Sequence, residues 1–120
     1  MHIEEFLRNV TATPGLTGSE MAVAEYIASA FRPYADEVKI DRLNNVVAHI
    51  KGDGPKVVFC AHLDEIGLMV VKIEDDGSLR MGNVGGVDPR ILPGMRVTVF
   101  GREALLGIVG AKAPHLQSEE

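Results

Sequence analysis

The chain has 120 residues, 46% of them hydrophobic and 24% charged, which is typical of a globular domain with enough apolar residues for a core. Its net charge of −5 argues against a nucleic-acid or anionic-membrane partner, because phosphate contacts need clustered Lys and Arg. One cysteine fits a reducing compartment, and the chain shows neither a signal peptide nor an apolar run near the roughly 20 residues of a membrane span, so we expect a cytoplasmic protein.

A short amphipathic helix is expected near the amino terminus. Ile3, Phe6, Leu7 and Val10 recur at helical spacing, and acidic residues early in this stretch suit the positive end of a helix dipole. The run Thr13-Pro14-Gly15 should end the helix, because Pro and Gly both disfavour its continuation.

A second helix is predicted to run to about Arg32 and to end at Pro33. The segment Thr17-Gly18-Ser19-Glu20 has the Thr-x-x-Glu form of a capping box, in which two side chains bond to backbone N–H groups at the start of a helix. The positions that this helix should bury are Ala24, Ile27, Ala28 and Phe31.

Three strand candidates follow. Residues 37–41 and 46–50 should pair across a tight turn at Asn44-Asn45, because Asn tolerates positive backbone angles. Residues 56–61 form a nearly continuous apolar run, which is typical of a strand buried on both faces, with Cys60 as a small core residue rather than a nucleophile. Helices followed by strands, one of them fully buried, indicate a layered α/β unit.

The pattern changes after Gly67. Several short strand candidates, separated by turns rich in Gly and Asp, suggest a small barrel or sandwich. These candidates are residues 68–73, 79–81, 96–100 and 105–109. We therefore predict two domains, an α/β portion at residues 1–67 and the start of a β-rich domain at residues 68–120.

His62 and Asp64 stand two positions apart at the end of the predicted buried strand. Strand side chains alternate, so both should project to one side and Leu63 to the other. The carboxyl ends of strands carry functional groups in α/β sheets, and a carboxylate can hold one imidazole nitrogen while the other binds a metal. On spacing alone, a metal role and a strand-end His beside a solvated Asp stay equally open.

Four segments of the sequence, in chain order, carry a resemblance to one family. They are Pro14-Gly15-Leu16-Thr17-Gly18-Ser19-Glu20, Ala61-His62-Leu63-Asp64-Glu65-Ile66-Gly67, Val84-Gly85-Gly86-Val87-Asp88-Pro89-Arg90, and Gly107-Ile108-Val109-Gly110 with Ala113-Pro114-His115-Leu116. Together they resemble the di-metal aminopeptidases that build tetrahedral, TET-type particles, the glutamyl and deblocking aminopeptidases. The second segment resembles the family's first metal-site motif.

The resemblance implies a fold, a chemistry and an assembly. The fold is a zinc-exopeptidase α/β/α catalytic domain into which a β-rich, barrel-like dimerisation domain is inserted. The implied activity is a metal-dependent aminopeptidase that releases amino-terminal residues from peptides with two divalent metal ions, zinc or cobalt. His62 would be a metal ligand and Asp64 the catalytic residue that orients it, while His115 is expected to make a structural hydrogen bond. The implied assembly is a dimer-based homo-oligomer that can reach a dodecamer.

The family's remaining ligands and general base lie beyond the sequence given. We therefore expect the isolated 120-residue chain to be inactive and to bind no metal tightly, since a single His and a neighbouring carboxylate cannot complete a two-metal site. For Asp64 the competing interpretation is a loop carboxylate that caps a backbone turn. One alternative for the whole chain is a non-catalytic assembly or interaction piece. Another is a hydrolase of the same family labelled as a cellulase, which the 5% aromatic content and the lack of Trp disfavour because sugar rings find little stacking surface.

Overall fold

The structure, a computed structural model, describes residues 2–111. The chain divides into two compact units, Met1–Gly86 and Val87–Glu120, which are described separately below. The predicted division into domains at residues 67/68 concerns the catalytic and inserted domains of the resembled family and stays a prediction. Within the described part of the chain, neither α-helix has the length and apolar character required to span a lipid bilayer.

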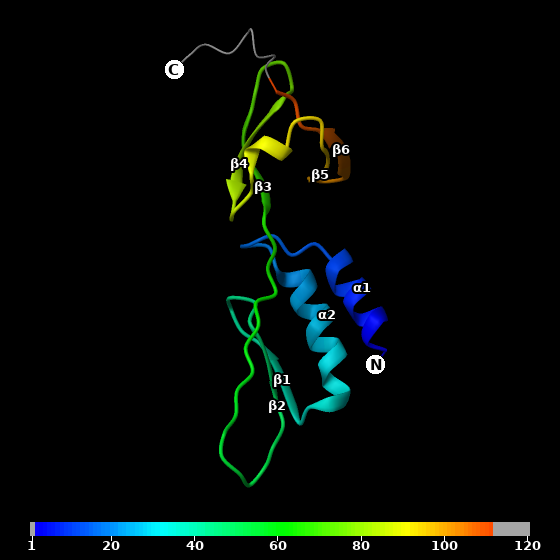
Figure 1. Cartoon of the computed structure of the whole chain (residues 1–120), viewed down its shortest axis with the longest axis vertical. Helices are drawn as coiled ribbons and strands as arrows, with labels where there is room; N and C mark the ends of the chain where they lie inside the picture. The colour runs from blue at the N-terminus through cyan, green and yellow to red at the C-terminus, as the bar shows by residue number, and fades with distance from the viewer. Residues whose placement is uncertain (1, 112–120) are drawn as a thin grey trace. The chain divides into compact units, whose positions relative to one another are not determined.

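Two helices open the first unit (Figure 1). Helix α1 spans Ile3–Ala12 and helix α2 spans Met21–Phe31, with a single 3-10 turn at Arg32–Tyr34 after it. Both helices confirm the sequence predictions, since the first ends at Thr13-Pro14 and the second gives way at Pro33.

Helix α2 carries the core of the first unit. It packs against α1 on one side and against the hairpin that follows on another. Val23, Ala24 and Ala28 are buried, whereas Ile27 and Phe31 are half-buried, so the prediction was right for the two alanines, overstated for the larger side chains, and missed Val23. Phe6 of α1 stacks on the rings of α2, which fixes the two helices to each other.

The predicted capping box at the start of α2 is wrong. Glu20 itself stands at the N-cap position, and no side chain caps the helix. Its carboxylate instead accepts hydrogen bonds from the backbone N–H of Gly18 and from the Asn44 side chain, and the Thr17 hydroxyl donates to Asp64. The Thr17 hydroxyl therefore bonds to a distant segment, and Glu20 is shared between the nearby Gly18 and the distant Asn44.

The predicted hairpin is confirmed. Strands β1 (Glu37–Ile40) and β2 (Val46–His49) pair antiparallel, and the turn between them places Asn44 at a φ of 63°. Asp41 holds this turn, because its carboxylate accepts hydrogen bonds from the backbone N–H groups of Leu43 and Asn45 and from the Asn45 amide.

Residues 56–61 are not a buried strand, and that prediction is wrong. They run as part of the open connection between β2 and β3, seen in green in Figure 1, without strand pairing. Val57, Val58 and Phe59 are 71%, 78% and 94% exposed, and Cys60 is exposed rather than in the core. A strand buried on both faces needs a neighbour at each edge and a layer on each face, and the described residues provide neither.

A second hairpin completes the first unit. Strands β3 (Gly67–Ile73) and β4 (Leu79–Val84) pair antiparallel with a register shift between Val70 and Lys72. The turn that joins them contains Gly77 at a positive φ of 83°. The two strands predicted at 68–73 and 79–81 are confirmed, the second one longer than expected.

The second unit contains a 3-10 turn at Pro89–Ile91 and the antiparallel pair β5 (Arg96–Phe100) and β6 (Ala104–Ile108). Both strands were predicted, although the prediction placed the start of β6 one residue too late, at Leu105. In residues 2–111 the strands form three separate two-stranded sheets. The mixed helix and strand fold is thus confirmed, whereas the inserted barrel-like dimerisation domain stays a prediction.

Candidate functional site

Two segments nearly fifty residues apart are held together next to the predicted site residues. Leu16, between the helices, pairs with Glu65 as an isolated parallel bridge. The Glu65 N–H donates to the Gly15 carbonyl at 2.8 Å, and the Gly15 N–H donates to Oε1 of the Glu65 side chain at 3.0 Å. The Thr17 N–H adds a bond to the Glu65 carbonyl at 3.3 Å. We call these contacts between residues 15–17 and Glu65 the loop clasp.

The loop clasp shows what Glu65 does in this chain. One oxygen of its carboxylate accepts a backbone hydrogen bond, and its own backbone makes two more to the loop. A side chain used in this way holds the two loops in register.

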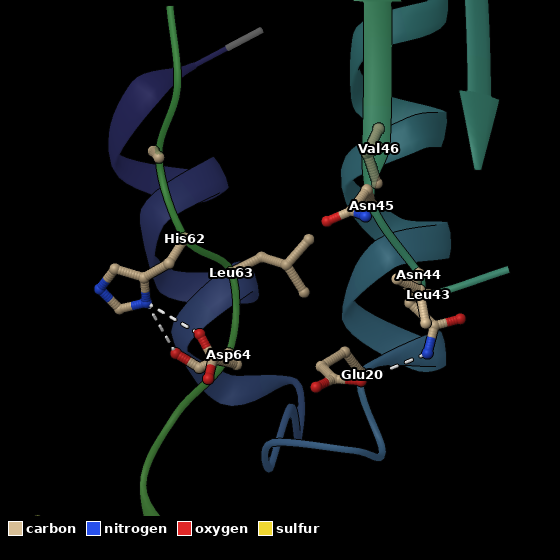
Figure 2. Close-up of a pocket in the computed structure, with 9 residues that line it drawn as sticks. Glu20, Leu43, Asn44, Asn45, Val46, His62, Leu63 and Asp64 are labelled. Carbon is tan, nitrogen blue, oxygen red and sulfur yellow. Dashed lines mark hydrogen bonds and ion pairs between the residues drawn. The ribbon is translucent and has the colours of Figure 1, made fainter. Parts of the chain in front are cut away.

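His62 and Asp64 lie on the same side of the chain. Nδ1 of His62 is 3.2 Å from Oδ1 of Asp64 and 3.1 Å from its backbone oxygen. Figure 2 shows the imidazole and the carboxylate together on one side, with Leu63 pointing to the other, as strand-like alternation predicts.

These distances assign the proton on the imidazole ring. Both atoms that face Nδ1 are oxygen acceptors, so Nδ1 must carry a proton and donate it. The second ring nitrogen, Nε2, is then the one available for a ligand, and the side chain is 87% exposed. A carboxylate that holds Nδ1 while Nε2 stays accessible is the common arrangement of a metal-binding histidine.

Both carboxylate oxygens of Asp64 have hydrogen-bond partners. Oδ1 faces His62, and Oδ2 accepts a hydrogen bond of 2.8 Å from the Thr17 hydroxyl. The bond from Thr17 lowers the pKa of Asp64 below its ordinary value, partial burial acts against this, and the contact with His62 adds a smaller lowering. Asp64 is therefore a carboxylate over the whole physiological pH range.

A pocket of about 260 Å³ opens beside this pair (Figure 2). Its wall combines the 61–64 segment with the turn after β1 and the start of α2; the lining residues are Glu20, Leu43, Asn44, Asn45, Val46, Ala61, His62, Leu63 and Asp64. Glu20 accepts a hydrogen bond of 3.3 Å from the Asn44 amide across this pocket. Its hydrogen bond to Gly18 is the main reason that the pKa of Glu20 lies below its ordinary value.

The donor set fits one metal ligand rather than a complete metal centre. Between residues 2 and 111, no three His, Cys, Asp or Glu side chains are grouped so that they could hold an ion. A catalytic zinc ion needs about three protein ligands, so His62 supplies one of several. What fits a metal here is the free Nε2 of His62 and the orienting carboxylate behind it.

The other candidates lie apart from this pair. His49 is an exposed residue of β2, and His115 lies outside the described residues. Sequence reasoning missed that Thr17 belongs to the site. The Thr-x-x-Glu pattern that suggested a cap was the available signal, because a hydroxyl so placed can also bond to a distant carboxylate.

Comparison with known proteins shows what this chain is similar to. The family of M42 glutamyl aminopeptidases matches residues 44–120. A lysyl aminopeptidase of Pyrococcus furiosus is 41% identical over 117 residues, which are 96% of this chain and 34% of that protein. The chain thus spans about a third of the length of the curated relatives that it matches.

Two solved structures show the same arrangement of elements. A TET aminopeptidase from a marine sediment archaeon, Thaumarchaeota archaeon SCGC AB-539-E09, is 32% identical with a TM-score of 0.88, over 96% of this chain and 33% of that one. A Thermotoga maritima protein described as an endoglucanase is 37% identical with a TM-score of 0.77, over 88% of this chain and 34% of that one.

Proposed function

The chain belongs to the M42 glutamyl aminopeptidase family, and on that premise we propose that it supplies part of the active site of a metal-dependent aminopeptidase. The observation that carries the proposal is the His62–Asp64 pair, with Nδ1 held by the carboxylate and Nε2 accessible. The reaction would be hydrolysis of the first peptide bond of a peptide with a free amino terminus.

His62 and Asp64 would have distinct roles in this reaction. Nε2 of His62 would hold one of two divalent ions, zinc or cobalt, and Asp64 would fix the ring in the tautomer that leaves Nε2 free. When bound, such ions supply Lewis-acid chemistry to the scissile carbonyl and to the attacking water. Asp64 acts through His62 and stays ionised, which keeps negative charge behind the ligand.

The remaining parts of the active site are proposed to come from the two thirds of the relatives' length that this chain does not span. They are the further metal ligands, including a bridging Asp, and the carboxylate general base. In this proposal residues 68–120 begin an inserted dimerisation domain, and the enzyme is a cytoplasmic homo-oligomer of the TET type, up to a dodecamer. The structural likeness to a TET aminopeptidase supports this assembly.

The test substitutes the pair in the whole protein. His62→Ala removes the ligand, so metal content and hydrolysis of aminoacyl p-nitroanilides should fall together. Asp64→Asn keeps the shape but not the charge, so it should retain more metal than His62→Ala while activity falls about 10–100-fold. His49→Ala, an exposed strand histidine, is the matched control and should change neither quantity. Full metal content and activity in His62→Ala would refute the assignment.

The alternatives give different results in the same protein. A cellulase would release reducing sugar from carboxymethylcellulose and leave aminoacyl substrates intact. The endoglucanase description of the Thermotoga maritima structure gives this reading no support, because that structure is a mislabelled neighbour, and the lysyl aminopeptidase and the TET structure favour peptides. An assembly piece without catalysis would show neither activity and no dependence on His62.

A further inference from the structure

Thr17 lies 47 residues before Asp64 in the sequence and touches it directly. The Thr17 hydroxyl has one proton and two acceptors within reach, Oδ2 of Asp64 at 2.8 Å and the Glu65 carbonyl at 3.4 Å. The much shorter distance assigns the proton to Asp64, since hydrogen bonds between oxygens are strongest near 2.7–2.8 Å.

The backbone of Thr17 is itself fixed. Its N–H donates to the Glu65 carbonyl, and the neighbouring Leu16 pairs with Glu65. The loop clasp therefore delivers the Thr17 hydroxyl to one carboxylate oxygen of Asp64 and leaves the other oxygen for His62.

Among the described residues, the other hydrogen bonds to the Asp64 carboxylate come from the His62 ring and from its own backbone N–H. The Asp64 side chain is 38% exposed and that of His62 87% exposed, so packing restrains neither of them strongly. Without the bond from Thr17, the carboxylate can rotate into water, and Nδ1 of the imidazole keeps only the backbone oxygen of Asp64, at 3.1 Å, as an acceptor.

We propose that Thr17 is a positioning residue of this site, which orients Asp64 so that Asp64 in turn holds the His62 imidazole with Nε2 free. The inference deepens the proposed function and rests on it for its catalytic meaning. The orientation of the ring, however, can be measured without any metal or substrate.

The first experiment measures the imidazole tautomer of His62 in the metal-free 120-residue chain by ¹⁵N NMR of labelled histidine. The wild-type ring should show a single Nδ1–H form. Thr17→Val keeps the side-chain shape and removes the hydroxyl, so the ring should shift toward the mixture of tautomers found in water. Thr17→Ser keeps the hydroxyl and should restore the wild-type signals. Thr11→Val is the matched control, because the Thr11 hydroxyl also makes a 2.8 Å bond but within helix α1.

The second experiment measures zinc affinity of the whole protein by competition with a chelator. Thr17→Val should weaken zinc binding about tenfold, the lower end of the range for partners that orient ligands, with Thr17→Ser and Thr11→Val near wild type. If Thr17→Val is insoluble, Thr17→Ala against Thr17→Ser gives the same comparison.

The outcomes separate the two proposals. Unchanged His62 signals in Thr17→Val, or equal losses in Thr17→Val and Thr17→Ser, would overturn the positioning role. A tautomer change in a protein that binds no zinc and cleaves no aminoacyl substrate would support the positioning role and refute the proposed function. A tautomer change together with the loss of affinity would support both.

Discussion

Gly15 of the loop clasp leaves no room for a larger side chain, so replacing it with alanine should displace the loop that contacts the His62–Asp64 segment. Gly15 is buried, and a Cβ added there would lie 2.8 Å from Cγ1 of Val23 and 3.4 Å from the Leu63 carbonyl oxygen. Carbon atoms in contact prefer about 3.5–4.0 Å, so a shift of roughly 1 Å is needed. Val23 is 1% exposed and cannot give way, so the loop must move, and its two hydrogen bonds to Glu65 must lengthen.

The expected cost follows from two opposing terms. Overpacking of this kind costs about 1–3 kcal/mol. The replacement also removes backbone freedom from the unfolded chain, which stabilises the protein by about 0.4–1 kcal/mol when the native backbone tolerates alanine. The net loss for Gly15→Ala is therefore between about 0 and 2.6 kcal/mol.

The matched control isolates the first term. Gly52 has no atom within 4 Å of an added Cβ, so Gly52→Ala should be neutral or slightly stabilising. Urea unfolding of the 120-residue chain, followed by circular dichroism at low concentration, gives the free energy of unfolding of both variants. Gly15→Ala should fall below Gly52→Ala by about 1–3 kcal/mol. Equal stabilities would show that the close approach of loop and helix is absent in solution.

Three further outcomes are expected from other parts of the chain. Gly85→Ala should destabilise the chain by about 1–3 kcal/mol in the same urea assay, because Gly85 has a φ of 76° and an added Cβ would lie 2.6 Å from Ile66. In the control Gly86→Ala, the added Cβ meets nothing within 4 Å, so this variant should be neutral. Hydrogen bonds from Asn45 and from the backbone of the turn lower the pKa of Asp41. The stability that these bonds give the β1–β2 hairpin should therefore be complete above about pH 4 and be lost as the pH falls through the lowered pKa. Amide exchange in the hairpin should accelerate at that low pH, and Asp41→Asn should abolish this pH dependence. The exposed apolar run around Phe59 should make the 120-residue chain self-associate, Phe59→Ser should reduce this, and light scattering that shows a stable monomer at high concentration would contradict it.

Local signals in the sequence were enough for most of the elements. The helical spacing of Ile3, Phe6 and Leu7 and the stop at Pro33 placed the two helices, and Asn44 marked the first hairpin turn. These features depend on residues close together in the chain, so a pattern of a few residues carries them. The His62–Asp64 contact has the same origin, because alternation along an extended segment is a local property.

The failure at residues 56–61 shows where local patterns stop. An apolar run such as Val57-Val58-Phe59 fits a buried strand, but pattern alone does not create the neighbouring strands and covering layers that burial requires. The backbone hydrogen bonds of a strand come from other segments, so the same six residues can be a central strand in one context and an open connection in another. The run is therefore better understood as a segment with strand propensity than as a strand of the described chain.

Thr17 shows the same limit of local patterns at the candidate site, because its partner lies far away in the sequence. A Thr three residues before a Glu is a cap signal, but the Thr17 hydroxyl bonds to Asp64 across the fold, and Glu20 bonds to Gly18 nearby and to Asn44 farther along the chain. In a capping box the Thr oxygen accepts a hydrogen bond from a backbone N–H of the helix, whereas here the Thr17 hydroxyl donates to the Asp64 carboxylate. The Thr17 side chain is directed toward Asp64, at 2.8 Å, and no side chain caps helix α2. The residue that the cap pattern misplaced is the one that links the first loop to the His62–Asp64 pair.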